Sequence, residues 1–239
     1  MVENSDTGDM TKPRLSYAIL LYQEKETFQK LINQLYRIPH SFEVRVVLDG
    51  DRPEMLELLE HYKKAHPNFY YERRSLNKNF SAQRNFIAAH CQGDYIVRID
   101  ADELMPEEIL QNIDLYLNKF DQEEYDAIWM PRINFSGAIS PELIARDRLK
   151  INDKGWVNWP DMQLKIYRNS PSLSWINTVH ERLVGSKKEY HFPQEEKYAI
   201  WHDKPAEALK ASNAFYRTFR WRCWEKLRKS IEKRLKRRR

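Results

Sequence analysis

Cysteine and long apolar runs are both scarce in this chain of 239 residues. The two cysteines, Cys91 and Cys223, lie far apart and form neither a metal-binding nor a redox spacing, which favours a reduced intracellular compartment. No N-terminal apolar run resembles a signal peptide, and no stretch of about 18 residues is uninterruptedly apolar. We therefore expect a chain that neither enters the secretory route nor spans a bilayer, and that is cytoplasmic or peripheral at the inner face of a membrane.

The charge is divided unevenly along the chain. Residues 217–239 hold twelve Lys or Arg and two Glu, which is a local charge of +10. The total of +5 minus this +10 leaves −5 on residues 1–216. A basic end of this kind indicates an anionic partner, either a membrane surface or a nucleic acid.

Strand-like and helix-like segments alternate from residue 15 onward, which predicts a single α/β domain with a mainly parallel, mixed sheet. A hydrophobic content of 41% suffices for one sizeable core. The predicted strands are 15–22, 44–49, 69–73, 95–99, 127–131, 163–168 and 198–202, and the predicted helices are 24–37, 53–65, 81–90 and 106–120. Residues 134–159 are expected to form a long loop, and residues 175–181 a turn led by aromatic side chains.

The two ends of the chain are expected to lie outside this domain. Residues 1–13 are polar and small and predict a disordered leader, so the domain is expected over residues 14–205. In residues 206–239 apolar side chains recur four apart among arginines and lysines, which predicts a basic amphipathic helix. Docking on an anionic membrane, packing of its first half on the domain, and binding of nucleic acid all fit this pattern.

Residues 93–103 carry the clearest chemical signal. A short strand rich in β-branched and aromatic residues ends in three carboxylates within four positions, Asp100, Asp102 and Glu103. Ligands of open α/β sheets collect outside the carboxyl ends of the strands, and neighbouring carboxylates repel each other unless a cation lies between them. Such oxygen ligands suit Mn²⁺ or Mg²⁺, with substrate phosphates completing the shell. The alternative is that Asp102 and Glu103 only cap the helix that follows.

Further motifs accompany this one in a fixed order. They are Tyr22-Gln23-Glu24, Val47-Leu48-Asp49-Gly50-Asp51, Asn79 to Asn85 with its Arg84-Asn85 pair, Asp100-Ala101-Asp102-Glu103, Asp161 to Arg168, and Trp175 through Val179-His180-Glu181. Together they resemble a family-2 glycosyltransferase of the GT-A fold, and most closely the bacterial lipopolysaccharide-core glucosyltransferase type. The resemblance implies a Rossmann-like domain that transfers a sugar, with inversion, from a nucleotide diphosphate donor. The donor is expected to be a UDP-sugar, and the acceptor a hydroxyl of a glycan, a lipid-linked or another polymeric molecule.

The resemblance also implies roles for individual residues. Asp100 and Asp102 are assigned to a Mn²⁺ or Mg²⁺ ion, and His202 is a further candidate ligand. The residues assigned to the donor are Tyr22, Glu24, Asp49, Arg84, Asp100 and Lys204. An arginine suits this place because its planar, permanently charged fork matches phosphate oxygens.

An inverting transfer needs a base that takes the proton from the acceptor hydroxyl. Glu181 is the first choice for this base, and Asp161 is the second. Structural roles compete with these assignments, since Asp49 also fits a turn, Arg84 a helix surface, and Glu181 a solvated carboxylate.

Two other kinds of protein stay open as alternatives. Nucleotidyltransferases share the fold and the metal site, but they usually begin with a Gly-rich loop after the first strand, and residues 21–25 contain no glycine. A non-enzymatic nucleic-acid-binding protein would act through the basic end of the chain. It would leave the carboxylates of residues 100–103 without a role.

Overall fold

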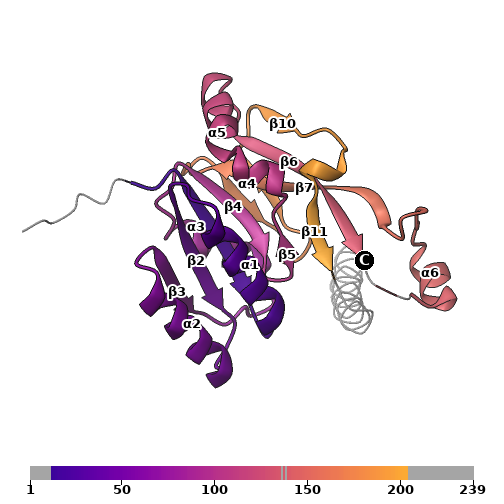
Figure 1. The fold of residues 1–239 in the computed structure, drawn as a ribbon, viewed down its shortest axis with the longest axis horizontal. Helices are drawn as coiled ribbons and strands as arrows, with labels where there is room; N and C mark the ends of the chain where they lie inside the picture. Colours follow the sequence, from indigo (N-terminus) through magenta and orange to yellow (C-terminus); the bar gives the residue numbers. More distant parts are fainter. Residues whose placement is uncertain (1–11, 136, 138, 204–239) are drawn as a thin grey trace, which may run out of the picture.

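Four parallel strands form the first half of the sheet (Figure 1). In this computed structural model, which describes residues 12–135, 137 and 139–203, they lie in the order β3-β2-β1-β4. Their bounds are β1 (Leu15–Leu21), β2 (Phe42–Leu48), β3 (Phe69–Arg73) and β4 (Tyr95–Asp100). Leu21 pairs with Leu48 and Leu20 with Asp100, so the carboxyl ends of β1, β2 and β4 meet along one edge of the sheet.

Gly93 allows the backbone that leads into β4 to lie close to the backbone of β1. A Cβ atom at this position would lie 2.6 Å from the carbonyl carbon of Leu15. The Gly93 N–H donates to the hydroxyl of Ser16 at 2.8 Å. Because only glycine tolerates such an approach to a neighbouring backbone, this residue holds β4 in register with β1.

Three helices connect these strands: α1 (Lys25–Arg37), α2 (Pro53–Ala65) and α3 (Phe80–Ala88). The apolar residues of α1 recur three and four apart and are all buried, namely Phe28, Leu31, Ile32 and Leu35. Pro53 begins α2, where its fixed φ suits a first helical turn. Asn79 caps α3 by accepting a hydrogen bond from the Ala82 N–H at 3.0 Å. The elements predicted for residues 15–100 are confirmed, with small shifts at their ends.

The second half of the chain makes the sheet mixed. Strand β7 (Val157–Arg168) runs antiparallel between β4 and β6 (Ala127–Phe135). Strands β10 (Glu189–His191) and β11 (Ile200–Asp203) pair parallel with β6, and β5 (Glu103–Leu104) pairs antiparallel with β11. The described sheet has nine strands with mostly parallel pairings, which confirms the predicted α/β domain.

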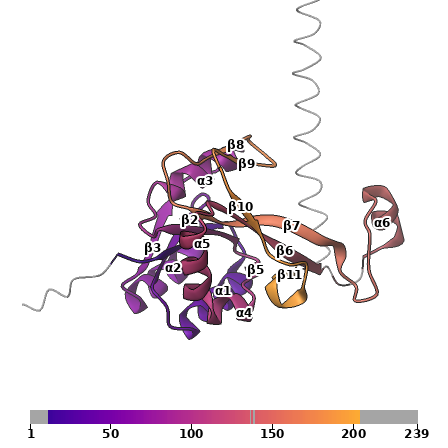
Figure 2. The same ribbon diagram turned by 90° about the horizontal axis from the view of Figure 1, so that it is seen from above.

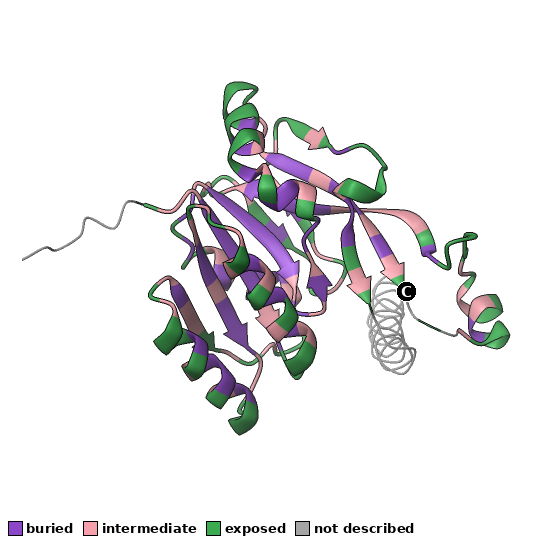
Figure 3. Ribbon diagram, in the orientation of Figure 1, coloured by how far each residue is buried: buried purple, intermediate pink, exposed green. Residues whose placement is uncertain are grey.

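Different elements cover the two faces of the sheet (Figure 2). On one face α1, α2, α4 (Glu107–Gln111) and α5 (Ile113–Gln122) pack a large apolar cluster against β1, β2 and β4. On the other face α3 and a hairpin of β8 (Ser174–Ile176) and β9 (Arg182–Val184) enclose a smaller cluster that includes Ile96 and Trp175. The strands between these layers are mostly buried, as Figure 3 shows. Side chains alternate along β4, so Arg98 and Asp100 share the second face with Ile96.

Three predicted segments differ from the structure. The helix predicted over residues 106–120 is two helices, because Asn112 between α4 and α5 has φ −116° and ψ 19°. The loop predicted over residues 134–159 contains α6 (Pro141–Asp147), capped by Ser140, and the start of β7. The turn predicted over residues 175–181 begins within strand β8. Strands β5, β9 and β10 are not predicted, since two or three residues are too few to show a period.

Some predictions fall on parts of the chain that the structure does not describe. Residues 1–11 of the predicted leader, Lys204, and the predicted basic helix over residues 206–239 lie outside the described residues. Among the helices of the described ranges, none is both long and apolar enough to span a bilayer. The domain bounds of 14 and 205 therefore remain predictions.

Candidate functional site

Glu103 organises the turn that follows β4. Its side chain is buried, and Oε2 accepts hydrogen bonds from the Asp100 N–H at 3.0 Å and from Lys165 Nζ at 2.5 Å. Oε1 accepts from Arg132 Nη1 at 2.9 Å. The alternative that Asp102 and Glu103 cap the next helix is wrong, because Glu103 bonds back to β4 and no side chain of the described residues caps α4.

Two cations keep Glu103 ionised inside the protein. Burial would raise the pKa of its carboxyl group, but Lys165 and Arg132 outweigh burial and lower this pKa to about 2. Lys165 is fully buried, and desolvation lowers the pKa of its ammonium group to about 8. Removing one partner of such a pair is strongly destabilising, because a charge is then left buried without compensation. The pair therefore fixes the backbone on which Asp100 and Asp102 lie.

Replacing Lys165 with Met is expected to lower the free energy of unfolding by about 3 kcal/mol, because Glu103 then loses one of its two cations. Urea unfolding followed by tryptophan fluorescence measures the change. Lys154→Met is the matched control, since its ion pair with Glu196 is largely exposed and such a pair contributes at most about 1 kcal/mol. Equal stability of Lys165→Met and the unmodified protein would contradict the role assigned to Lys165.

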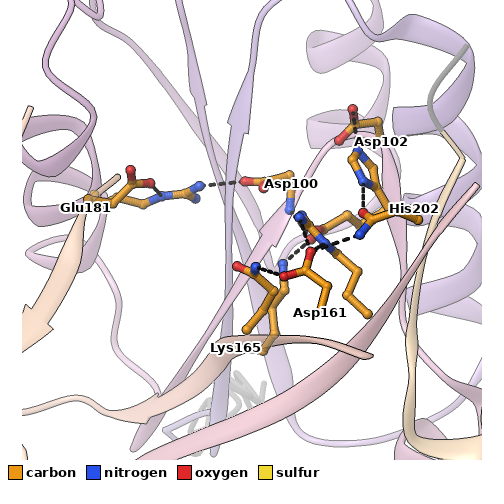
Figure 4. Close-up of polar contacts among 11 residues, drawn as sticks. Asp100, Asp102, Asp161, Lys165, Glu181 and His202 are labelled. Carbon is orange, nitrogen blue, oxygen red and sulfur yellow. Dashed lines mark hydrogen bonds and ion pairs between the residues drawn. The ribbon is translucent and has the colours of Figure 1, made fainter. Parts of the chain in front are cut away.

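Arg84 connects two carboxylates that are distant in sequence (Figure 4). It lies on α3 and is only 4% exposed, so the alternative of a helix-surface cation is wrong. Its Nη2 donates to Asp100 Oδ1 at 2.5 Å, and its Nε donates to Glu181 Oε1 at 3.4 Å. Within the described ranges its third nitrogen, Nη1, is buried without a hydrogen-bond partner. Arg84 thus joins β4 to the end of the segment after β8.

Arg84 and Asp100 stabilise each other's charged form. Burial would lower the pKa of the Arg84 guanidinium, but Asp100 and Glu181 raise it above its ordinary value. Burial would likewise raise the pKa of Asp100, but Arg84 and Lys165 hold it well below the usual range. Both groups are therefore ionised at neutral pH.

Asp102 and His202 face each other where β4 and β11 end. His202 Nε2 lies 3.2 Å from Asp102 Oδ2, and His202 Nδ1 lies 2.8 Å from Asn134 Oδ1. The Asn134 amide is oriented by its Nδ2, which donates to Asp161 Oδ2 at 2.9 Å. Because an amide oxygen only accepts, His202 Nδ1 donates to Asn134, and Nε2 is the ring nitrogen that faces Asp102. Metal-binding histidines are commonly oriented in this way.

A divalent cation fits this pair of side chains. A carboxylate oxygen and an imidazole nitrogen together suit Mn²⁺, whereas Mg²⁺ prefers oxygen ligands. In the part of the chain that the structure describes, no group of three or more His, Cys, Asp or Glu side chains is placed to hold a metal ion. An ion held by Asp102 and His202 would therefore take its remaining ligands from a substrate or from water. Asp100, the other predicted ligand, is engaged by Arg84 beside them (Figure 4).

Tyr22, Glu24 and Asp49 lie just after β1 and β2, at the same edge of the sheet as the end of β4. Glu24 Oε2 accepts from the N–H groups of Tyr22 and of the next residue, both at 2.9 Å. Asp49 Oδ1 accepts from the Leu76 N–H at 2.8 Å. These bonds fix the strand ends, and Tyr22 is 43% exposed at the edge. The structure thus places the described residues that were assigned to the sugar donor near the edge formed by the carboxyl ends of β1, β2 and β4.

Asp161 accepts more hydrogen bonds than any other carboxylate discussed so far. Oδ2 accepts from Arg132 Nε and Nη2 at 3.0 and 2.7 Å and from Asn134, and Oδ1 accepts from Gln163 at 2.7 Å. Burial would raise the pKa of Asp161, but Arg132 and the two amides lower it. Asp161 is therefore a weak proton acceptor that holds Asn134, and through it His202, in place.

A pocket of about 360 Å³ opens beside Glu181, between the β8–β9 hairpin and strands β6 and β7. Its lining residues are Arg98, Trp129, Gln163, Leu164, Trp175, residues 181–186 and Glu189. Glu181 is the one residue of this lining that the sequence analysis gives a role, although Gln163, Leu164 and Trp175 fall within the family motifs. The sequence does carry one signal that could have pointed to Arg98, namely a charged residue at a buried position within an apolar strand, here β4. Lys165 shows the same signal in β7.

Comparison with known proteins gives a family. Residues 16–182, more than half of the chain, match the sequence model of Glycosyl transferase family 2. An undecaprenyl-phosphate 4-deoxy-4-formamido-L-arabinose transferase of Pseudomonas syringae pv. syringae is 24% identical over 159 residues, 64% of this chain and 41% of that protein. The minor teichoic acid biosynthesis protein GgaB of Bacillus subtilis is 27% identical over 134 residues, 55% of this chain and 14% of that protein. The chain thus spans less than half the length of these relatives.

Solved structures show the same fold. The crystal structure of S. aureus TarS 1-349 superposes with a TM-score of 0.57 at 15% identity and covers 80% of this chain and 60% of that chain. The same protein in complex with UDP-GlcNAc gives a TM-score of 0.57 at 15% identity and covers 80% and 58%. The narrower resemblance to the lipopolysaccharide-core glucosyltransferase type stays a prediction. The family resemblance carried by the motifs is confirmed: the chain belongs to glycosyl transferase family 2.

Proposed function

We propose that this protein transfers a sugar from a UDP-sugar to a hydroxyl of a glycan or lipid-linked acceptor, with inversion and with a divalent metal ion. The observation that carries the proposal is the ion-paired chain Asp100–Arg84–Glu181. Arg84 contacts both Glu181, the candidate base, and Asp100, a carboxylate at the end of β4. In open α/β sheets this is the edge at which ligands bind.

The nucleotide is assigned to the side of Tyr22, Glu24 and Asp49. The Tyr22 ring carries the Arg52 guanidinium 3.6 Å from its centre on one side and offers its other side to a base or ribose, and the Asp49 carboxylate is a fixed hydrogen-bond acceptor. The diphosphate would then lie near Asp102 and His202, within reach of the positive charge that Arg84 holds beside Asp100. When bound, a divalent ion neutralises negative charge that develops on the leaving diphosphate.

Glu181 is the group proposed to move the proton. It takes the proton of the acceptor hydroxyl while the acceptor oxygen bonds to the anomeric carbon and the bond from that carbon to the diphosphate oxygen breaks. Among the residues that the structure describes, Glu181 has one ion pair, the 3.4 Å contact with Arg84. Asp161 accepts four hydrogen bonds and has a lowered pKa, which disfavours it as a base.

The identities of donor and acceptor are supported by the relatives. One solved structure of the same fold contains UDP-GlcNAc, and one relative is named for undecaprenyl phosphate and another for teichoic acid. These names support a UDP-sugar donor and a lipid-linked or polymeric acceptor for this chain. A thermal-shift screen of UDP, GDP and CDP, each with and without Mn²⁺, tests the donor. A rise in Tm with UDP and Mn²⁺ is expected, and no rise with any of the three would contradict the proposal.

We further infer that residues 206–239, which lie outside the described residues, attach the protein to an anionic membrane surface. The support is compositional, namely a local charge of +10 over residues 217–239 interleaved with two tryptophans. Removing residues 221–239 is expected to release the protein from vesicles that contain phosphatidylglycerol, because each cation near such a surface contributes about 1 kcal/mol. Vesicle co-sedimentation at low salt measures this, with vesicles of phosphatidylcholine alone as the control.

Two other results would contradict membrane attachment through residues 206–239. Unchanged sedimentation of the truncated protein would mean that another surface binds the vesicles. Failure of the full chain to bind vesicles, together with salt-sensitive binding of a polynucleotide, would favour nucleic acid instead.

A further inference from the structure

Arg98 is a buried cation that no carboxylate of the described ranges contacts directly. Its residue is 9% exposed, and Nε is buried without a hydrogen-bond partner. Across residues 12–203 as described, Arg98 forms no ion pair, and its guanidinium lies 5.4 Å from the centre of the Trp175 ring. Its neighbours Arg84 and Arg132 differ, since each is paired with two carboxylates. Burying a guanidinium without a direct partner is costly. The carboxylates of Asp100, Glu103 and Glu181 act on Arg98 only from beyond contact distance, which leaves a place for an anion bound in the pocket.

Arg98 lines the pocket beside Glu181, so its missing partner would be a ligand of that pocket. Trp129 is partly exposed and provides aromatic surface of the kind that packs against sugar rings, while Trp175 is buried beneath Arg98. A second arginine, Arg182, lies exposed in the same lining. The carboxylate of Glu189 is already engaged by the Trp129 indole at 2.9 Å and the Ser186 hydroxyl at 3.0 Å.

We propose that this pocket binds the acceptor, and that the acceptor is a sugar or polyol bearing an oxyanion, either a phosphate or a carboxylate, held by Arg98 with help from Arg182. The proposal rests on the proposed function, because Glu181 at the edge of the pocket is taken as the base for the acceptor hydroxyl. The oxyanion would anchor the acceptor and leave a hydroxyl beside Glu181. Specificity for acidic acceptors would then come from Arg98, since a guanidinium fork binds phosphate and carboxylate with two parallel hydrogen bonds.

The test follows the indole ¹H–¹⁵N signals of Trp129 and Trp175 in the full chain. The probes are glucose 6-phosphate and glucuronate, with methyl glucoside as their neutral counterpart. The charged probes are expected to shift both signals and to bind about tenfold more tightly than methyl glucoside. The tighter of the two charged probes identifies the anionic group of the acceptor.

Arg98→Gln is expected to remove the preference for the charged probes, while Lys187→Gln, which removes an exposed cation next to the hairpin, is expected to keep it. Arg98→Met is expected to raise Tm by a few degrees, because an uncompensated buried charge is removed. This rise separates a ligand-binding arginine from one that holds the fold together.

Three results would overturn the proposal. They are equal affinity for charged and neutral probes, a loss of UDP affinity in Arg98→Gln with oxyanion binding intact, and a fall in Tm for Arg98→Met. A lack of UDP binding by the unmodified protein in the presence of Mn²⁺ would count against the proposed function alone, because the indole signals report the pocket independently.

Discussion

Replacing Glu181 with Gln is expected to lower kcat by about 10²-fold or more while the affinity for the nucleotide changes little. The reason is that Gln keeps the size of the side chain and an oxygen that can accept from Arg84, but it cannot take a proton. Transfer to a soluble acceptor, measured by release of UDP at saturating donor, gives kcat. Thermal shift with UDP and Mn²⁺ reports donor binding separately.

Glu195→Gln is the matched control for this change. The Glu195 side chain is 56% exposed and lies outside the pocket beside Glu181. We expect it to alter kcat by no more than a few fold. If Asp161→Asn lowers kcat strongly and Glu181→Gln does not, the base has been assigned to the wrong carboxylate.

Replacing Asp102 with Asn is expected to lower metal-dependent transfer by about 10²-fold or more, because it removes the only carboxylate oxygen within contact distance of His202 among the described residues. His202→Ala should have an effect of the same order. Asn134→Ala should have a smaller effect, about tenfold, since it leaves both proposed ligands in place but frees the His202 ring. Initial rates over a series of Mn²⁺ concentrations measure all three variants.

The control for the metal is Asp203→Asn. Asp203 is exposed on β11, next in sequence to His202. Its replacement by Asn removes one negative charge, as Asp102→Asn does, but leaves Asp102 and His202 unchanged. Its dependence on Mn²⁺ is expected to match that of the unmodified protein. Unchanged Mn²⁺ dependence in both Asp102→Asn and His202→Ala would contradict the proposal that Asp102 and His202 hold the metal ion.

Local patterns in the sequence were sufficient for the parallel half of the fold. The strands β1, β2 and β4 are apolar runs that are buried on both faces, and α1 shows a helical spacing of buried residues, so each element is visible without its neighbours. Asp100 and Asp102 are found for the same reason, since they end a recognisable strand. The family motifs place Arg84 and Glu181, although only the structure shows that they touch.

The remaining parts depend on contacts between distant residues. Lys165 and Glu103 are 62 positions apart, and each by itself reads as an ordinary charged residue. The role of Asp161 could not be predicted because it depends on Arg132 and Asn134, which β6 supplies through its pairing with β7. The pocket is similarly made where a three-residue hairpin strand meets β6 and β7, and no period in the sequence indicates such a meeting.

The central claim is that the edge of the sheet at Asp102 and His202 binds a nucleoside diphosphate together with a metal ion. Calorimetric titration of UDP in the presence and absence of Mn²⁺, for the unmodified protein and for Asp102→Asn, tests it most directly. We expect UDP to bind with Mn²⁺, to lose about tenfold or more in affinity without it, and to show the same loss in Asp102→Asn with Mn²⁺ present. UDP affinity that depends on neither Mn²⁺ nor Asp102 would contradict the account.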